Sequence, residues 1–275
     1  CDDGEVLSPG WVAITGFNHY ADIFTSESIR GPFAGVLVWN FVFATASEFF
    51  SFSIGLILAI VLQHERVRGR TFYRSIYILP YAVPAILSMF IWQGLLNEQF
   101  GQVNDLLEVF GFERVPWLTD GTWAKVAVIL VNTWLSFPYM FLISTGALQA
   151  IPVELQEAAR VDGAGGWKVF TNVTFPLLMV SLAPLLIASF AFAFNNFVII
   201  YILTTGGPPI LDAAVPVGST DILITFTYDL ALASGVGNRF ALASAVTVLI
   251  FLIVLVVSAI GFRFTRRLEE IYGGL

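Results

Sequence analysis

The sequence predicts an all-α integral membrane protein, a bundle of about five spanning helices. Of its 275 residues, 57% are hydrophobic and only 12% are charged, whereas soluble domains contain about 25% charged residues. The apolar residues gather in five runs, at 33–62, 75–96, 126–150, 173–203 and 240–262. Each run exceeds the roughly 20 apolar residues that a spanning helix needs. Because the runs are unbroken, they disfavour a β-barrel, whose strands alternate in hydrophobicity.

Basic residues predict how this bundle is oriented. The connections 63–74 and 149–172 and the end 263–275 carry nine of the 13 Lys and Arg residues, while the other side carries 13 of the 20 acidic residues. Lys and Arg are enriched in cytoplasmic loops, so this first set should face the cytoplasm. We therefore expect a transmembrane domain at 33–262, followed by a cytoplasmic tail at 263–275.

The segment 1–32 precedes the first apolar run. It begins with Cys1 instead of Met, and it lacks the basic start, apolar centre and cleavage site of a signal peptide. Its first residues are polar and acidic. We therefore expect 1–32 to be the end of a truncated periplasmic region.

The first two runs each contain an unusual residue. Glu48 lies in the middle of 33–62, where a carboxylate is costly and is often a proton relay or an ion site. Since no run contains a basic partner, we favour a protonated or water-lined side chain. In 75–96, Pro80 and Pro84 interrupt helical hydrogen bonding and distort the backbone around Tyr81. This distortion is either a hinge or a packing kink.

Polar residues in the third and fourth runs form a candidate binding site. Phe192 and Asn196 are four residues apart and should share one helix face. An amide beside an aromatic ring suits a carbohydrate, because rings stack on sugar C–H groups and amides bond hydroxyls. The alternative is polar contact between helices, worth about 0.6–2 kcal/mol each, and spacing alone leaves both open. Spacing of i, i+3, i+4 and i+7 places four further residues on one face: Asn132, Leu135, Ser136 and Tyr139.

The polar connection 149–172 predicts a short helix, a glycine turn and a second helix. Pro152 precedes a helix-forming stretch, which ends at the glycine-rich segment 162–166 because glycine readily adopts positive φ. A phosphate cradle is the weaker interpretation, since no strand precedes the glycines and no Lys-Ser/Thr follows them. A polar projection of this kind indicates a docking site for a partner.

No enzyme machinery is evident, so we predict neither catalytic residues nor a metal site. The sequence lacks the GxxxxGK[ST] loop that binds ATP phosphates. His19 and His64 belong to opposite sides of the predicted membrane, and the single Cys1 excludes a cysteine-based zinc site. The net charge of −7 argues against nucleic acid, which requires a basic patch.

The connection 149–172 resembles the EAA signature of ABC-importer permeases, which reads EAA, three residues, Gly, nine residues and I-x-L-P. Here the signature is Glu157-Ala158-Ala159, Gly163 and then VTFP at 173–176, with Val and Phe replacing Ile and Leu. The segments ILPYAVPA, VNTWL, DGAG and IASFAF are further similar to the MalF-type maltose/maltodextrin permease family. This second resemblance extends over essentially the whole chain.

The resemblance implies a type I (MetI/MalF-like) importer bundle, multi-pass in the bacterial inner membrane, that transports maltose or maltodextrin. Its partners would be a homologous MalG-like permease subunit, a dimer of MalK-like ATPase subunits and a periplasmic sugar-binding protein. The chain itself would be no enzyme and need no cofactor, because the partner subunit binds ATP. The implied ATPase-coupling residues are Glu157, Ala158, Ala159, Asp162, Gly163 and Ala164.

The resemblance also assigns a sugar pocket, with three departures. Ser136 replaces a Gly, Ala85 a Ser and Ala193 an Asn, which puts the exact sugar in doubt. Another oligosaccharide, trehalose or a polyol is the first alternative. A proton-coupled secondary transporter that uses Glu48 is the second, and it leaves the EAA signature unexplained. The implied substrate-binding residues are Tyr81, Asn132, Leu135, Ser136, Tyr139, Phe192 and Asn196.

Overall fold

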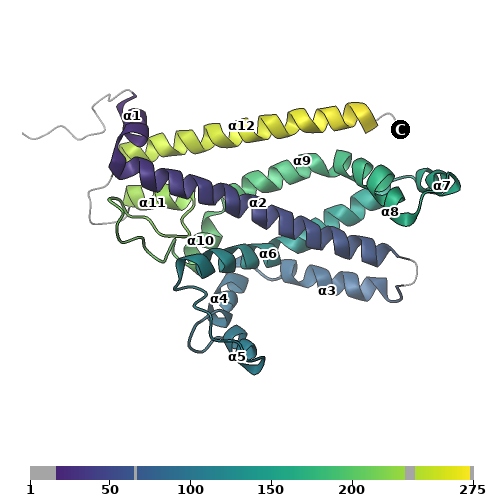
Figure 1. Ribbon diagram of the computed structural model, residues 1–275, viewed down its shortest axis with the longest axis horizontal. Coiled ribbons are helices and arrows are strands. Elements are labelled where there is room, and N and C mark those ends of the chain that lie inside the picture. The colour runs from purple at the N-terminus through teal and green to yellow at the C-terminus, as the bar shows by residue number, and fades with distance from the viewer. Residues whose placement is uncertain (1–16, 65–66, 233–238, 273–275) are drawn as a thin grey trace, which may run out of the picture.

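The computed structural model describes residues 17–64, 67–232 and 239–272. In this part of the chain the secondary structure is helical, apart from one isolated β-bridge between Pro209 and Gly218. Residues 1–16 of the predicted periplasmic region, 65–66 of the first predicted cytoplasmic connection and 273–275 of the predicted tail lie outside the described residues. Figure 1 shows the long helices with their axes roughly aligned along the molecule, successive ones running in opposite directions.

Four helical segments are long and apolar enough to cross a membrane. They are α2 (Glu27–Gln63), α6 (Gly121–Ala150), the segment Gly166–Phe194 and α12 (Phe240–Tyr272). A bent pair, α3 (Arg70–Ala82) and α4 (Ala85–Leu95), passes the same test together. Counting that pair as one span gives five, so the prediction of an all-α bundle with about five spans is confirmed.

Shorter helices connect these spans. The segment Gly166–Phe194 consists of α8 (Gly166–Val169), a π-helical turn (Phe170–Thr174) and α9 (Phe175–Phe194). The last helix, α12, continues without a break through the position where we expected a tail to begin at 263. The other short helices are α1 (Asn18–Thr25), α5 (Gln102–Val109), α7 (Val153–Val161), α10 (Phe197–Leu203) and α11 (Leu223–Leu232).

The run 75–96 does not form a straight helix. Its two helices meet at an angle of 89°. Val83, between them, has extended backbone angles (φ −82°, ψ 133°), because the ring of Pro84 disfavours helical angles at the preceding residue. The distortion that the prolines predict is therefore a sharp bend.

The run 173–203 is likewise not one helix, which corrects the expectation of a single fourth span. The α9 helix ends at Phe194 and α10 begins at Phe197. The amide group of Asn195 donates to the backbone carbonyl of Ala191 at 3.0 Å, and such side-chain bonds offer the backbone an alternative to continuing a helix. Phe192 and Asn196 therefore lie on either side of a break.

The helices α2 and α6 cross closely at Gly55. A Cβ atom at this position would lie 2.6 Å from the backbone nitrogen of Phe141 and 2.7 Å from the carbonyl carbon of Met140. Small residues allow such close backbone approach between helices in membranes. This crossing fixes how the middle of α2 faces α6.

The connections gather at two ends of the bundle. In Figure 1 the end of α2, the start of α3, the α7–α8 segment and the end of α12 lie at one end, while α1 and α11 lie at the other. This grouping agrees with the sidedness that the basic residues predict.

Candidate functional site

A cavity of about 780 Å³ lies among the helices, and we refer to it as the central cavity. Its walls come from α2, from the bend between α3 and α4, from α6, and from α9 with the residues that follow it. All seven residues predicted to bind substrate line it: Tyr81, Asn132, Leu135, Ser136, Tyr139, Phe192 and Asn196. The structure thus brings together residues that are separated by up to 115 positions in the sequence.

The bend and the break in the helices shape this cavity. The bend at Val83-Pro84 brings the end of α3, with Tyr81, and the start of α4 to the same wall. The break after α9 exposes Asn196 to the cavity beside Phe192. On α6, the residues with the predicted helical spacing share one wall. The two irregular segments and one regular helix face therefore build the site.

The two asparagines of the cavity contact each other. The side-chain NH₂ group of Asn196 donates to the side-chain oxygen of Asn132 at 3.2 Å. This bond is a polar contact between helices, since it joins α6 to the segment after α9. It uses only one polar group of each amide, so the same residues can also serve as a sugar site. The NH₂ group of Asn132 and the side-chain oxygen of Asn196 can still bond a ligand.

Two aromatic rings are exposed toward the cavity. The side chain of Phe192 is 73% exposed and that of Tyr81 is 59% exposed. The neighbouring Phe194 is buried and packs edge-on against Phe41, with ring centroids 5.1 Å apart. Phe192 and Tyr81 therefore present apolar faces to a molecule in the cavity, whereas Phe194 belongs to the core.

The wall formed by α2 was largely missed from sequence. Ser47, Glu48 and Ser51 line the cavity. Among the described residues, Ser47 Oγ and Glu48 Oε1 are buried without a hydrogen-bond partner, whereas Ser51 Oγ donates to the carbonyl oxygen of Ser47 at 2.6 Å. Glu48 is recognisable from sequence as a carboxylate in the middle of an apolar run, whereas nothing in the sequence distinguishes the two serines as cavity residues.

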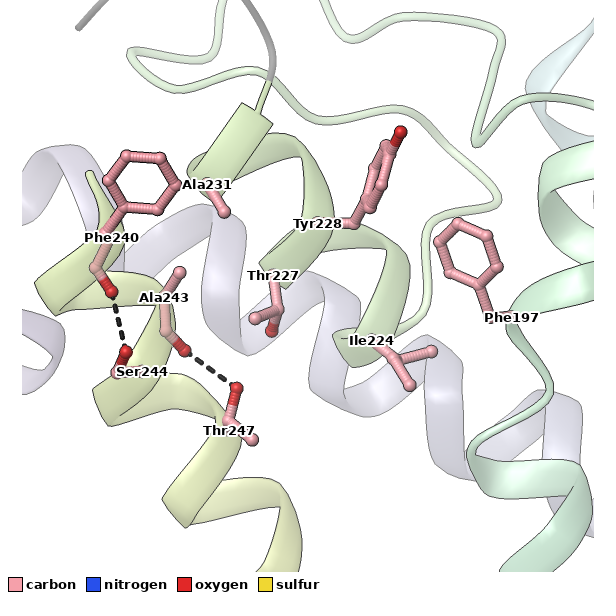
Figure 2. A pocket seen from close by; sticks show the side chains of 9 residues that line it. All are labelled: Phe197, Ile224, Thr227, Tyr228, Ala231, Phe240, Ala243, Ser244 and Thr247. Carbon is pink, nitrogen blue, oxygen red and sulfur yellow. Dashed lines mark hydrogen bonds between the residues drawn. The ribbon is translucent and has the colours of Figure 1, made fainter. Parts of the chain in front are cut away.

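A second pocket, between α10, α11 and α12, has a different character. Figure 2 shows that the hydroxyls of Ser244 and Thr247 point back at their own helix. They donate to the backbone carbonyls of Phe240 and Ala243 at 2.8 and 3.0 Å. Thr227 likewise donates to its own helix. Since these hydroxyls are already bonded, this pocket offers a ligand little polar recognition, and the central cavity is the better candidate.

The connection 149–172 folds as predicted, into a helix, a glycine turn and a second helix. Gly163 ends α7 with a φ of 85°. The amide of Ala164 donates to the carbonyl of Ala159 and the amide of Gly163 donates to that of Arg160, both at 3.0 Å. This pair of bonds is the Schellman motif, in which glycine supplies the left-handed residue.

Most residues predicted to couple to an ATPase are accessible in this segment. Glu157, Ala158, Asp162 and Gly163 are exposed, and Ala159 and Ala164 are half-buried. Sequence reasoning missed two apolar side chains beside them, Val161 (87% exposed) and Trp167 (76% exposed). The segment therefore offers apolar as well as charged groups to a partner.

The comparisons with known proteins identify the family. The family of binding-protein-dependent transport system inner membrane components matches residues 51–270. The chain belongs to this family. It is also 44% identical over 262 residues to the "Maltose/maltodextrin transport system permease protein MalF" of Escherichia coli (strain K12), covering 95% of this chain and 51% of that protein.

A second relative agrees. The MalF protein of Vibrio vulnificus (strain YJ016) is 44% identical over 263 residues, covering 96% of this chain and 50% of that protein. The chain thus spans about half the length of the curated relatives it matches. As a member of the binding-protein-dependent inner membrane components, it is a multi-pass protein of the bacterial inner membrane.

Solved structures of importers share the fold of this chain. A bacterial ABC transporter involved in the import of the acidic polysaccharide alginate matches with a TM-score of 0.76 and 25% identity, over 92% of this chain and 84% of that one. A MetNI methionine ABC transporter matches with a TM-score of 0.60 and 17% identity, over 89% of this chain and 99% of that one. The second match shows the fold alone. The predicted type I importer bundle is confirmed.

Proposed function

We propose that this chain is the permease subunit of an ATP-driven importer that carries maltose or maltodextrin across the inner membrane by alternating access. The observation that carries the proposal is the central cavity, where an asparagine pair lies beside two exposed rings. The MalF names of relatives that are 44% identical support the sugar.

The residues of the cavity suit a sugar in distinct ways. Phe192 and Tyr81 offer faces on which the C–H groups of a pyranose stack. Asn132 and Asn196 offer one donor and one acceptor group to hydroxyls. For transport to be directional, these contacts must differ in free energy between the inward- and outward-facing states.

The energy for that change comes, in this proposal, from a separate ATPase. The segment from α7 to α8 docks on it, with Glu157 to Ala164 and the apolar Val161 and Trp167 at the contact. The complex further contains a second, homologous permease subunit and a periplasmic binding protein that delivers the sugar. Motion of the docked segment would reorient the helices around the cavity.

Uptake of radiolabelled maltose by cells that express the complete transporter tests this proposal. We expect uptake that survives a protonophore as long as cellular ATP is maintained, and that unlabelled maltotriose inhibits. Uptake that a protonophore abolishes at constant ATP would instead support proton coupling. Stronger inhibition by trehalose or a polyol than by maltotriose would assign a different solute.

A further inference from the structure

The α2 wall of the central cavity is polar at the middle of an otherwise apolar helix. Ser47, Glu48 and Ser51 lie there, 20 to 24 residues after the first residue of α2, Glu27. Ser51 satisfies its hydroxyl within the helix, but Ser47 Oγ and Glu48 Oε1 have no partner among the described residues. Buried polar atoms normally have hydrogen-bond partners, so two unpaired atoms beside one cavity distinguish this wall from the rest of the helix.

Glu48 forms no ion pair with any residue that the structure describes. The ion pairs that the structure describes involve His19, Arg114 and Arg266, none of which lines the cavity. No group of three or more potential metal ligands occurs in the described chain either. A structural salt bridge or a metal site therefore does not account for this carboxyl group.

The lining of the cavity has a definite electrostatic character. Its titratable members are Glu48 and the phenols Tyr81 and Tyr139, and Lys, Arg and His are absent from its described lining. These three groups are neutral or negative at every pH. A ligand that carries a carboxylate would thus find no compensating cation on the described wall that this chain contributes, and buried charges require such a partner.

We propose that Glu48 is a specificity-determining residue of the central cavity, which bonds hydroxyls of a neutral oligosaccharide and excludes saccharides that carry carboxylates. The inference rests on the proposed sugar transport and adds which class of sugar is accepted. It separates this chain by chemistry from the similar alginate transporter, whose polysaccharide is acidic. Of the two states that the sequence left open for Glu48, the proposal takes the water-lined one: the carboxylate is ionised in the water-filled cavity, and its accessible oxygen accepts from sugar hydroxyls.

Competition binding to the purified membrane complex tests this inference. The soluble binding protein is omitted, because it would select sugars by itself. Radiolabelled maltose is displaced in equilibrium dialysis by maltose or by its derivative with carboxylates at both C6 positions. We expect the wild type to prefer maltose at least tenfold. Glu48→Gln should narrow that ratio at least threefold, because it removes the negative charge and keeps the shape.

Two further variants make the test decisive. Glu27→Gln removes an exposed carboxylate from the same helix outside the cavity and should leave the ratio unchanged. Glu48→Val places an apolar residue in the spanning helix and serves as the second variant if Glu48→Gln fails to assemble. It should likewise narrow the preference for maltose over the dicarboxylate, and it should weaken maltose binding about threefold. An unchanged ratio in the Glu48 variants overturns the role of Glu48 alone. A wild type that binds neither sugar overturns the proposed function with it.

Discussion

At the scale of single residues, Phe192 shows how position decides what a side chain contributes. It lies two residues before Phe194 on α9, yet Phe194 is buried against Phe41 while Phe192 is exposed to the central cavity. Burying a large aromatic side chain against a partner is favourable, so an exposed ring beside two amides is expected to find that partner in a ligand.

Replacing this ring gives a direct prediction. Phe192→Ala should raise the maltose concentration for half-maximal uptake about tenfold, because a lost aromatic contact of about 1.4 kcal/mol corresponds to a factor of ten. The measurement is initial uptake over a range of sugar concentrations. Phe251→Ala removes a similarly exposed ring from α12, outside the cavity, and should not change that concentration. Equal curves for both variants would rule out stacking on Phe192.

At the scale of secondary-structure elements, two glycines have roles that their surroundings define. At Gly55 the limitation is space, because a Cβ atom would overlap the backbone of α6. At Gly163 there is space around the Cα atom, and the limitation is the positive φ of the turn after α7. The packing of two spans and the termination of α7 therefore depend on glycine for different physical reasons.

The α2–α6 crossing is tested by one methyl group. Gly55→Ala should destabilise the protein by about 1–3 kcal/mol, because over-packing forces neighbouring atoms to shift. Thermal unfolding of the purified complex in detergent measures this loss. At Gly35, on the same helix, an added Cβ atom would have no neighbour within 4 Å. The Gly35→Ala protein should therefore unfold at the wild-type temperature or slightly above it. A Gly55→Ala protein as stable as the control would mean that the helices separate easily.

The glycine turn allows a matched pair of proline variants. Gly163→Pro cannot adopt a φ of 85° and loses the amide that bonds the carbonyl of Arg160. It should insert into the membrane normally but uncouple ATP hydrolysis from uptake. Gly165 has a φ of −67°, which proline adopts without strain, so Gly165→Pro should remain coupled. The ratio of sugar imported to ATP hydrolysed in proteoliposomes distinguishes them, and normal coupling in Gly163→Pro would exclude a role for this turn.

At the scale of the whole molecule, the regular features were predictable from sequence. Long apolar runs define the spans, and the helical spacing of Asn132 to Tyr139 places four residues on one wall of the cavity. The glycine turn was also predictable, since few sequences other than a glycine cluster end a helix so clearly. The segment 149–172 needed its charges and its EAA spacing together before a docking role could be inferred.

The irregular features were not predictable to the same degree. Pro84 indicates a distortion, but the angle of 89° depends on how α4 packs against α10 and α6. The break at Asn195 lies inside an apolar run and coincides with one side-chain hydrogen bond, from Asn195 to the carbonyl of Ala191. Ser47 could not be distinguished from Ser51, because serines in spanning helices commonly bond their own backbone, and only the fold reveals which of the two does so.

The orientation of the entire bundle yields the last prediction. Charge bias predicts that the end of α12 is cytoplasmic, and α11 lies at the opposite end of the bundle in Figure 1, so the loop before α11 is expected to be periplasmic. In a Cys1→Ser background, Leu211→Cys should react with a membrane-impermeant maleimide in spheroplasts, because Leu211 is highly exposed. Arg267→Cys, also exposed, should react only after the membrane is permeabilised. The reverse pattern would place the segment from α7 to α8 in the periplasm, away from ATP, and would remove the basis for the proposed coupling to a cytoplasmic ATPase.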